Sequence, residues 1–375
     1  MENLTAGKQN HYYMKQLIAI ISLIGLVSCK QERPFEARDI NEVEIETFIE
    51  DSTLSVRAMA FDTEYLYYGS SNHFGKRAFH GENKIDLTKL EWSDNKDHIK
   101  YYVTNNSDSL SFRAISVVNE TMFAISIGNP ARLYKLSRKS TKPVLVYEEQ
   151  NDKVFYDSMD FWNEQEGIAI GDPTDNCMSI IITRDGGNTW NKISCDDLPK
   201  AKDGEAAFAA SDTNIAIVGD NTWVATGGKA SRILYSPDKG ITWEVFETPI
   251  VQGLETTGMY SIDFYDEFNG FAIGGDYTKP DDNAANKIRT QDGGKTWELV
   301  AQGQEPGYRS CVQYIPNREG KELVAIGFNG INHSNDGGLN WKHLSDEGFY
   351  TIRFLNDSVA YAAAKGRISK LIFKE

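Results

Sequence analysis

Seven polar or aromatic residues recur at matching points of a repeated sequence pattern, and several of them carry groups that bind anions. Each stands at the start of a short segment in which apolar residues alternate with others, as in a β-strand. Guanidinium groups bind carboxylates through paired hydrogen bonds, and tyrosines and carboxylates can act as nucleophiles or proton donors. If the segments converge, these side chains form one ligand-binding ring; alternatively, they only neutralise one another as salt bridges. The residues are Arg57, Arg113, Asp157, Glu205, Tyr260, Arg309 and Tyr350.

A second layer of candidate binding residues follows glycines at the ends of later strands. Asp172 is the most site-like of them, because it stands in Gly171-Asp172-Pro173, where the proline restrains the turn that aims the carboxylate. Capping of that turn is the alternative role for Asp172. Asn129 and Asp276 occupy comparable positions in other repeats.

The sequence contains no pattern typical of a metal site or a cofactor. The six histidines are scattered, and there is no Cys-x-x-Cys, haem-attachment or Gly-x-Gly-x-x-Gly motif. We therefore expect no metal ion and no cofactor. The net charge of -15 also argues against a nucleic acid as partner, because phosphate binding requires a basic face.

A repeated eight-residue sequence indicates the turns between the elements that would position these side chains. It reads Ser/Thr-x-Asp-x-Gly-x-Thr-Trp, with Asn340 in place of Thr in the last copy. The Asp carboxylate can accept backbone N–H bonds across such a turn, the glycine supplies a positive φ, and the tryptophan ring packs between sheets. We interpret the four copies as structural turns rather than catalytic sites. They span residues 183–190, 236–243, 290–297 and 334–341.

A strand, an acidic turn and a second strand form another repeated frame along the chain. Counting the first strands gives seven units, which start near residues 57, 113, 157, 205, 260, 309 and 350. Each full unit is long enough for a four-stranded propeller blade. The sequence therefore predicts an all-β fold, a seven-bladed β-propeller of four-stranded blades, over residues 41–375, with the seven candidate residues around its central channel.

The fourth and the last of these units are irregular. The first strand of the fourth unit begins at Glu205 or, in a second register, covers Asn214–Val218; Glu205 then lies on a loop over the channel mouth. The last unit has room for only three strands. We expect Val43–Ile49 to supply the fourth by pairing with the strand near Ile368–Phe373, which closes the ring and removes an open edge. The alternative is that residues 30–50 are only a flexible tether.

The N-terminal region predicts export. Leu17–Val27 is an apolar run too short to span a bilayer and of the length of a signal-peptide core. The run ends in Leu26-Val27-Ser28-Cys29, which resembles the lipobox of bacterial lipoproteins; an ordinary export signal with a chance cysteine is the alternative. The resemblance implies a signal peptide over residues 1–28, with Met14 as the better start, a lipid on Cys29 and a tether over residues 29–40. It also implies a lipoprotein of the cell envelope, at the outer membrane and facing either the periplasm or the surface.

The other three cysteines belong to the predicted propeller. Cys177 and Cys195 flank a predicted hairpin with its turn near Gly186, so they should stand nearly opposite each other on neighbouring strands. In an exported protein such a pair can form a disulfide, and two buried free thiols are the alternative. Cys311 lies in a predicted inner strand and is expected to be a small core residue.

The four turn sequences and the frame around them are similar to those of the BNR/Asp-box propellers, and within these the chain resembles the propeller-type photosystem II assembly and stability factors. Sialidases and sortilin-type receptors share the motif more distantly. The resemblance implies a binding or assembly-factor module without catalysis, which engages a protein or a glycan through its channel face. A monomer, held at a membrane through the lipid anchor, is the expected state.

A glycoside hydrolase, sialidase-like in plan, is the alternative function that the resemblance implies. Arg57, Arg113 and Arg309 would then grip a carboxylate, Tyr260 or Tyr350 would be the nucleophile with Glu205 beside it, and Asp157 would be the acid/base. The chain departs from the sialidases in two respects: it reads Val56-Arg57-Ala58-Met59 where they have Arg-Ile-Pro, and it predicts seven blades where they have six.

Overall fold

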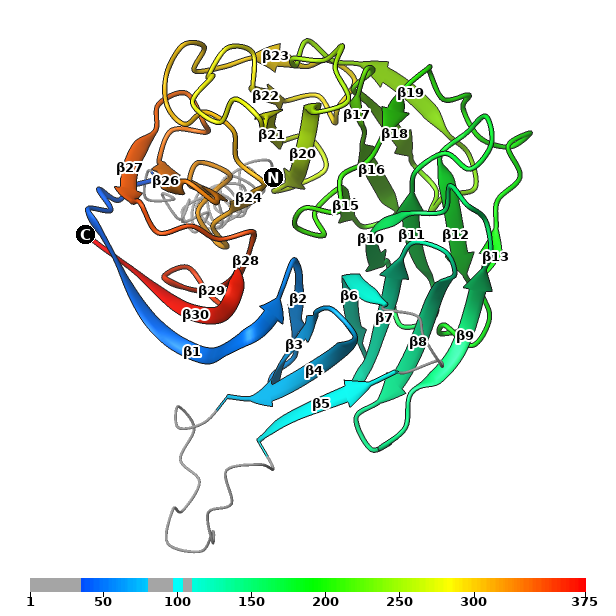
Figure 1. The fold of residues 1–375 in the computed structure, drawn as a ribbon. Coiled ribbons are helices and arrows are strands. Elements are labelled where there is room, and N and C mark those ends of the chain that lie inside the picture. Colours follow the sequence, from blue (N-terminus) through cyan, green and yellow to red (C-terminus); the bar gives the residue numbers. More distant parts are fainter. Residues whose placement is uncertain (1–34, 80–96, 104–109) are drawn as a thin grey trace, which may run out of the picture. The chain divides into compact units, whose positions relative to one another are not determined.

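Seven antiparallel sheets stand around a central axis like the blades of a propeller (Figure 1). The computed structural model describes residues 35–79, 97–103 and 110–375, and the part from Ala37 to Glu375 forms one compact unit. Within the described residues all regular structure is β-strand, and no helix is present that is long and apolar enough to cross a membrane. The predicted signal peptide and residues 29–34 of the predicted tether, Cys29 among them, lie outside the described residues.

Each blade contains four strands, which confirms the predicted fold, and in the first six blades the strands follow chain order from the inner to the outer edge. The first three blades consist of β2 (Ala58–Phe61), β3 (Tyr65–Gly69), β4 (His73–Ala78) and β5 (His98–Tyr102); β6 (Ser111–Val118), β7 (Thr121–Ile127), β8 (Ala131–Ser137) and β9 (Val144–Glu149); and β10 (Tyr156–Phe161), β11 (Gly167–Gly171), β12 (Ser179–Thr183) and β13 (Asn191–Lys192). The next three consist of β15 (Ile215–Val218), β16 (Asn221–Ala225), β18 (Arg232–Ser236) and β19 (Glu244–Glu247); β20 (Thr257–Phe264), β21 (Gly270–Asp276), β22 (Lys287–Thr290) and β23 (Glu298–Leu299); and β24 (Cys311–Tyr314), β25 (Leu323–Gly327), β26 (Gly330–Ser334) and β27 (Lys342–Ser345).

The seventh blade joins the two ends of the propeller. It consists of β28 (Thr351–Phe354), β29 (Val359–Ala363), β30 (Lys365–Lys374) and β1 (Glu42–Ser55), which lies along β30 in Figure 1. Val43 pairs with Phe373 and Ile49 with Ile368, as predicted from the sequence. The flexible-tether alternative is therefore wrong for residues 42–50.

The packed part of the N-terminal segment begins before the predicted boundary at residue 41. Ile40 is buried in the core between blades six and seven. The Arg38 guanidinium forms an ion pair of 2.6 Å with Glu322, whose side chain is fully buried, and also donates a hydrogen bond to the Asp357 carbonyl. Residues 37–40 are thus part of the closed ring rather than of a free tether.

The four repeated turn sequences adopt one hydrogen-bonded geometry. In the first copy the Asp185 carboxylate accepts hydrogen bonds from the Asn188 and Thr189 N–H groups and from the Thr189 hydroxyl. Gly187 has a φ of 71°, and a Cβ at this position would overlap the Phe123 ring, so only glycine fits. Trp190 is buried against the neighbouring blade. The geometry therefore assigns these residues to the turn and to packing between blades.

The fourth blade follows the second of the two predicted registers. Its inner strand is β15, whereas Glu205–Ala206 forms only a short strand, β14, which pairs with β17 (Gly227–Gly228). The starting point near residue 205 for the fourth unit was wrong, because residues 193–214 form a long crossing from the outer edge of blade three to the centre of the ring.

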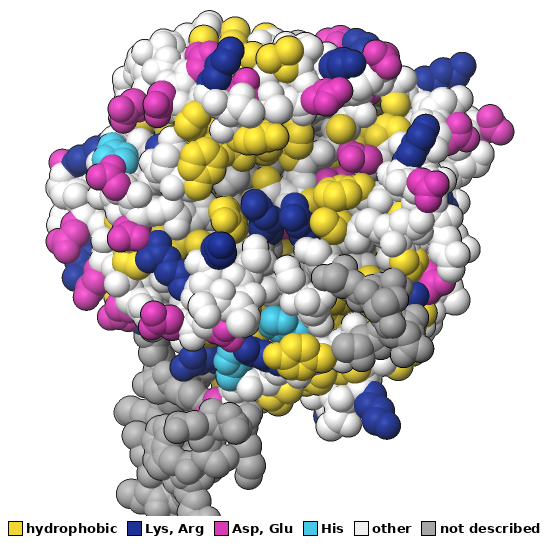
Figure 2. Space-filling model, in the orientation of Figure 1, with side chains coloured by type: hydrophobic (Ala, Val, Ile, Leu, Met, Phe, Trp, Pro, Cys, Tyr) yellow, Lys and Arg dark blue, Asp and Glu magenta, His cyan; other side chains and the backbone are white. Residues whose placement is uncertain are grey.

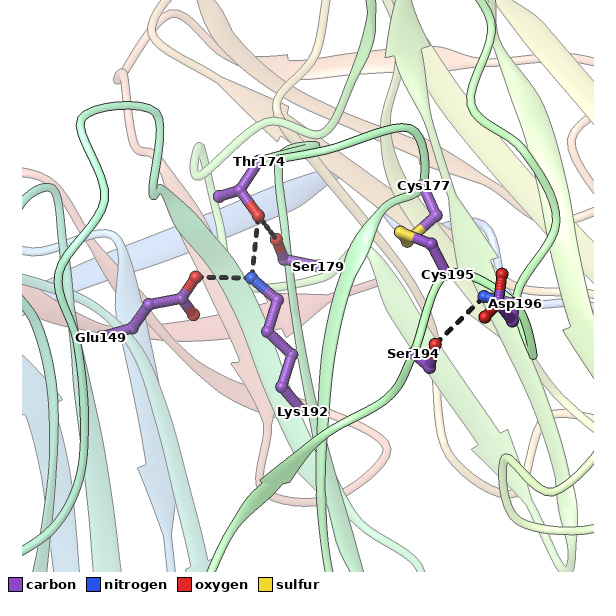
Figure 3. The surroundings of a disulfide bond; sticks show 8 residues. All are labelled: Glu149, Thr174, Cys177, Ser179, Lys192, Ser194, Cys195 and Asp196. Carbon is purple, nitrogen blue, oxygen red and sulfur yellow. Dashed lines mark hydrogen bonds and ion pairs between the residues drawn. A yellow bond between two sulfur atoms is a disulfide. The ribbon is translucent and has the colours of Figure 1, made fainter.

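A disulfide between Cys177 and Cys195 holds the start of this crossing (Figure 3). Beside it, Lys192 Nζ donates hydrogen bonds to Glu149 and Thr174, which tie the outer edge of blade three to blade two. Lys200 then pairs with Cys177 across a single β-bridge. The third propeller cysteine, Cys311, is a buried free thiol.

Candidate binding face and the plugged channel

The inner strands present unpaired backbone edges to the central channel, and all of the seven candidate residues except Glu205 lie at or near the start of these strands. An unpaired strand edge requires hydrogen-bond acceptors for its N–H groups. The pairing of the inner strand with the second strand shifts register at Arg113, Asp157 and Tyr260, so each of these residues occupies a β-bulge. A bulge re-aims the side chain of the extra residue, and here it occurs at the predicted positions in three blades.

The channel is filled by the end of the long crossing, residues Phe208–Thr213, which we call the plug. The plug makes hydrogen bonds to blades other than its own. Its Asp212 carboxylate accepts from the Ile115 and Met159 N–H groups of blades two and three. The Thr213 carbonyl accepts from the Ile262 N–H of blade five, and the Ser211 hydroxyl donates to the Ser310 carbonyl before blade six.

Blade seven holds the plug from the remaining side. The Thr351 hydroxyl donates to the Ser211 carbonyl at 2.8 Å, and the Arg353 guanidinium donates to the Asp212 carbonyl at 2.9 Å. Ser211, Asp212 and Thr213 are all buried. The plug therefore closes the channel and forms the floor of the face on which the candidate residues stand.

Arg57 and Arg113 lie above this floor without a carboxylate at ion-pair distance among the described residues. Arg57 Nη1 lies 3.5 Å from the Ala210 carbonyl, and Arg113 Nη1 lies 3.5 Å from the Ala209 carbonyl, both long for hydrogen bonds. The Arg57 guanidinium stacks 4.0 Å above the centre of the Tyr350 ring, and its buried Nε has no hydrogen-bond partner. Burial and the charge of Arg57 lower the pKa of Arg113, although the nearby Asp157 opposes the shift.

Asp157 and Asp172 form an acidic pair beside Arg113. Asp157 is fully buried, and neither of its carboxylate oxygens makes a hydrogen bond of good geometry. Burial and the charge of Asp172 raise the pKa of Asp157 well above its usual range, although Arg113 and nearby backbone N–H groups oppose the shift. Burial also raises the pKa of Asp172 to about 6. Asp172 accepts a hydrogen bond of 2.7 Å from the Ala207 N–H, so it caps the segment that leads into the plug.

Tyr260 belongs to an aromatic cluster rather than to a reactive pair. Its ring stacks on Phe208 of the plug at 3.9 Å and meets Tyr308 edge-on at 4.8 Å. Its hydroxyl donates to the Thr256 carbonyl, and burial raises its pKa. The cluster extends from Tyr308 to the exposed rings of Tyr277 and Phe328. In Figure 2 hydrophobic side chains surround basic side chains at the centre of the ring.

Glu205 and Arg309 do not join the central group. Both Glu205 carboxylate oxygens bind Arg232 at 2.6 and 3.0 Å, and one also accepts from the Thr226 hydroxyl. Arg309 donates to the amide oxygens of Asn332 and Asn329, and burial lowers its pKa to about 10. Glu205 makes no hydrogen bond to Tyr260 or to Tyr350, the two candidate nucleophiles of the glycosidase alternative. The structure brings together Arg57, Arg113, Asp157, Asp172 and Tyr350, with Tyr260 nearby.

Several polar residues of the channel were not predicted from the sequence. They are Asp160, Asp212, Asp263 and Arg353. Asp263 shows their common role, because its carboxylate accepts hydrogen bonds from the Phe264 and Tyr314 N–H groups at the inner edges of blades five and six. Two of these residues, Asp160 and Asp263, occupy the same position of the repeated frame, fourth in residues 157–161 and 260–264, so the repeat could have indicated them. No repeat pattern marks Asp212. Among the described residues no group of three or more His, Cys, Asp or Glu side chains forms a candidate metal site.

Comparisons with known proteins show a shared fold. No protein-family model and no curated protein matches the chain. A structure of YCF48 bound to D1 peptide is 12% identical over 91% of this chain and 98% of that chain, with a TM-score of 0.62. YCF48 from Cyanidioschyzon merolae is 11% identical over 88% and 98%, with a TM-score of 0.59. A structure of streptogramin B lyase is 14% identical over 90% and 100%, with a TM-score of 0.61. The chain is thus a seven-bladed β-propeller similar in fold to proteins of different activities.

Proposed function

We propose that the protein is a binding module that holds a partner protein on the face above the plug. The observation that carries this proposal is the pair Arg57 and Arg113, two half-buried cations with no carboxylate at ion-pair distance among the described residues. A buried charge without a counter-ion is costly. An incoming carboxylate would remove this cost, so the arrangement favours a partner that presents an acidic side chain or a chain terminus.

The aromatic cluster beside the arginines supports a protein as the partner. Tyr277 and Phe328 are about half exposed, and Tyr260 and Tyr308 pack beneath them. Aromatic side chains and arginine are the residues most enriched in the centres of protein interfaces. A similar fold carries a bound D1 peptide in YCF48, which supports a peptide segment as the bound element.

Photocrosslinking from the binding face tests the proposal. A photoreactive amino acid at Phe328 should crosslink to a specific partner in cells, whereas one at Leu145, an equally exposed apolar residue on the outer strand of blade two, should not. The double variant Arg57→Gln/Arg113→Gln should abolish the Phe328 crosslink, and Arg184→Gln, at a distant turn, should leave it unchanged. A Phe328 crosslink that survives the loss of both arginines would contradict the proposal.

We further propose that the chain works at a membrane, as an exported lipoprotein with its lipid on Cys29. The apolar run and the Leu26-Val27-Ser28-Cys29 sequence support this, and a disulfide between Cys177 and Cys195 suits an oxidising compartment. Cys29→Ser should yield an unprocessed or soluble protein. Its recovery from membranes as a processed lipoprotein would refute the lipid anchor.

A further inference from the structure

The plug does not come from a blade repeat. It makes hydrogen bonds to blades two, three, five and seven and to the segment before blade six. A ring of seven blades leaves seven inner edges, whose N–H groups need acceptors. Blades two, three and five obtain theirs from Asp212 and Thr213. The plug therefore supplies hydrogen-bond acceptors to these inner edges, as an additional paired strand would at the edge of an open sheet.

Asp212 is the anchor of the plug. It is buried, and each of its two carboxylate oxygens accepts one backbone N–H, from Ile115 at 2.9 Å and from Met159 at 3.1 Å. Its φ of 58° lies in the left-handed region, which few residues other than Gly, Asn and Asp adopt. Such a conformation persists only where surrounding contacts over-determine it, and it commonly occurs at functional sites.

The surroundings of Asp212 contain charges of both signs. Arg353 of blade seven lies near the carboxylate and also influences Asp160 and Asp263, which are partly buried acids on the inner strands of blades three and five. Burial raises the pKa of Asp212 to about 8 in spite of Arg353 and the two N–H donors. Each Asp212 oxygen accepts one backbone N–H. A carboxylate can therefore make both hydrogen bonds, whereas an amide has only one acceptor oxygen.

The residues next to Asp212 in the plug contact the proposed binding residues directly. The Ala210 and Ala209 carbonyls face Arg57 and Arg113, and Phe208 stacks on Tyr260 with the two rings nearly parallel. The guanidinium groups and the aromatic cluster thus rest on a six-residue segment whose position depends on the Asp212 carboxylate.

We propose that Asp212 is the positioning residue of the binding face: by fixing the plug to blades two and three, it sets the places of Arg57, Arg113 and Tyr260 without touching the partner. This inference rests on the proposed function for its consequence in binding, but its structural part can be measured without a partner. Asp263 provides the control, because it is a partly buried acid that also accepts two inner-edge N–H groups and makes no hydrogen bond to the plug.

The partner-independent experiment measures the reactivity of the two arginines with phenylglyoxal and the hydrogen exchange of the Ile115 and Met159 amides, both by mass spectrometry. Asp212→Ala should increase the modification rate of Arg57 and Arg113 at least threefold and should deprotect both amides. Asp263→Ala should do neither. If Asp212→Ala fails to fold, Asp212→Asn, which keeps one acceptor, should show the same changes to a smaller degree. Unchanged arginine reactivity in a folded Asp212 variant would overturn the proposal.

The binding experiment uses the Phe328 crosslink as its readout. Asp212→Ala should reduce the crosslink yield at least tenfold, whereas Asp263→Ala should leave it near the wild-type level even where both variants melt at similar temperatures. Equal loss of the crosslink in both variants would show a merely structural role for Asp212 and would overturn the proposal. A wild-type protein that gives no specific crosslink would refute the proposed function alone, and the arginine reactivities would still decide the positioning role.

Discussion

The closure of the ring by β1 makes a quantitative prediction about two isoleucines far apart in the sequence. Ile49 of β1 is buried and pairs with Ile368 of β30, and both belong to one core cluster with Leu54, Val56 and Tyr361. If β1 is an integral strand, Ile49→Ala opens a cavity in a rigid core. If the segment were loosely attached, the same substitution would have no effect on stability.

Truncation of a buried isoleucine to alanine costs about 2–5 kcal/mol. The entropy of unfolding is about 2.1 cal/mol/K per residue, which for the unit from Ala37 to Glu375 amounts to about 0.7 kcal/mol/K. The melting temperature of Ile49→Ala should therefore fall by about 3–7 °C. Because Ile49 and Ile368 are in contact, their double-mutant cycle should give a coupling energy of about 0.5–3 kcal/mol.

Calorimetry of the wild type, Ile49→Ala, Ile368→Ala and the double variant provides the cycle. Thr47→Ala, an exposed neighbour on the same strand, is the matched control and should change the melting temperature by less than a degree or two, since surface substitutions are usually within about 0.5 kcal/mol. A coupling energy of zero, together with an Ile49→Ala variant that melts like the wild type, would refute closure by β1. Removal of residues 30–50 should go further and expose β30 to protease, and the Arg57–Tyr350 contact at this seam should be lost with it.

Three further predictions address other parts of the fold. Trp190→Ala should lower stability by about 3–5 kcal/mol because its ring is buried between blades, and an unchanged melting temperature would show that the ring is exposed. Reduction of the Cys177–Cys195 disulfide should destabilise the protein by about 3 kcal/mol, since it closes a short loop; equal melting with and without reductant would contradict this. Burial raises the pKa of Asp263 to about 7, so its contribution to stability is present at acid pH and is lost as the pH rises through 7. Asp263→Asn should therefore flatten the decline in melting temperature between pH 5 and pH 8, and an identical slope in both proteins would show that Asp263 does not titrate there.

The features that the sequence predicted well are local or repeated. The four turn sequences specify their geometry within eight residues, because Asp185 and its counterparts bond to N–H groups three and four residues ahead. The strand count followed from period-two alternation, and the role of β1 followed from the absence of one strand in the last blade. Each of these conclusions needs only the repeat and the requirement that sheet edges be paired.

The features that the sequence did not predict depend on contacts between distant segments. Glu205 has the charge and approximate place of a channel residue, but its partner is Arg232 on the third strand of blade four, and nothing in the repeat indicates that pairing. Arg309 likewise donates hydrogen bonds to two asparagines of blade six, Asn329 and Asn332. The Asp212 bonds reach back 97 residues to Ile115 and 53 to Met159, within a crossing that has no counterpart in other blades.

The plug also explains how a symmetric fold can offer an asymmetric binding face. Seven similar blades around an open channel would present seven similar inner edges to a partner. The plug enters from blade four and covers these edges unequally, with a carboxylate for blades two and three, a carbonyl for blade five and hydroxyl contacts towards blades six and seven. Above it, the cations stand on blades one and two, whereas the aromatic rings stand on the plug and on blades five and six. Under the proposed function, a partner with one acidic and one apolar side would meet this face in a single orientation. The plug, which departs from the repeat, would fix that orientation.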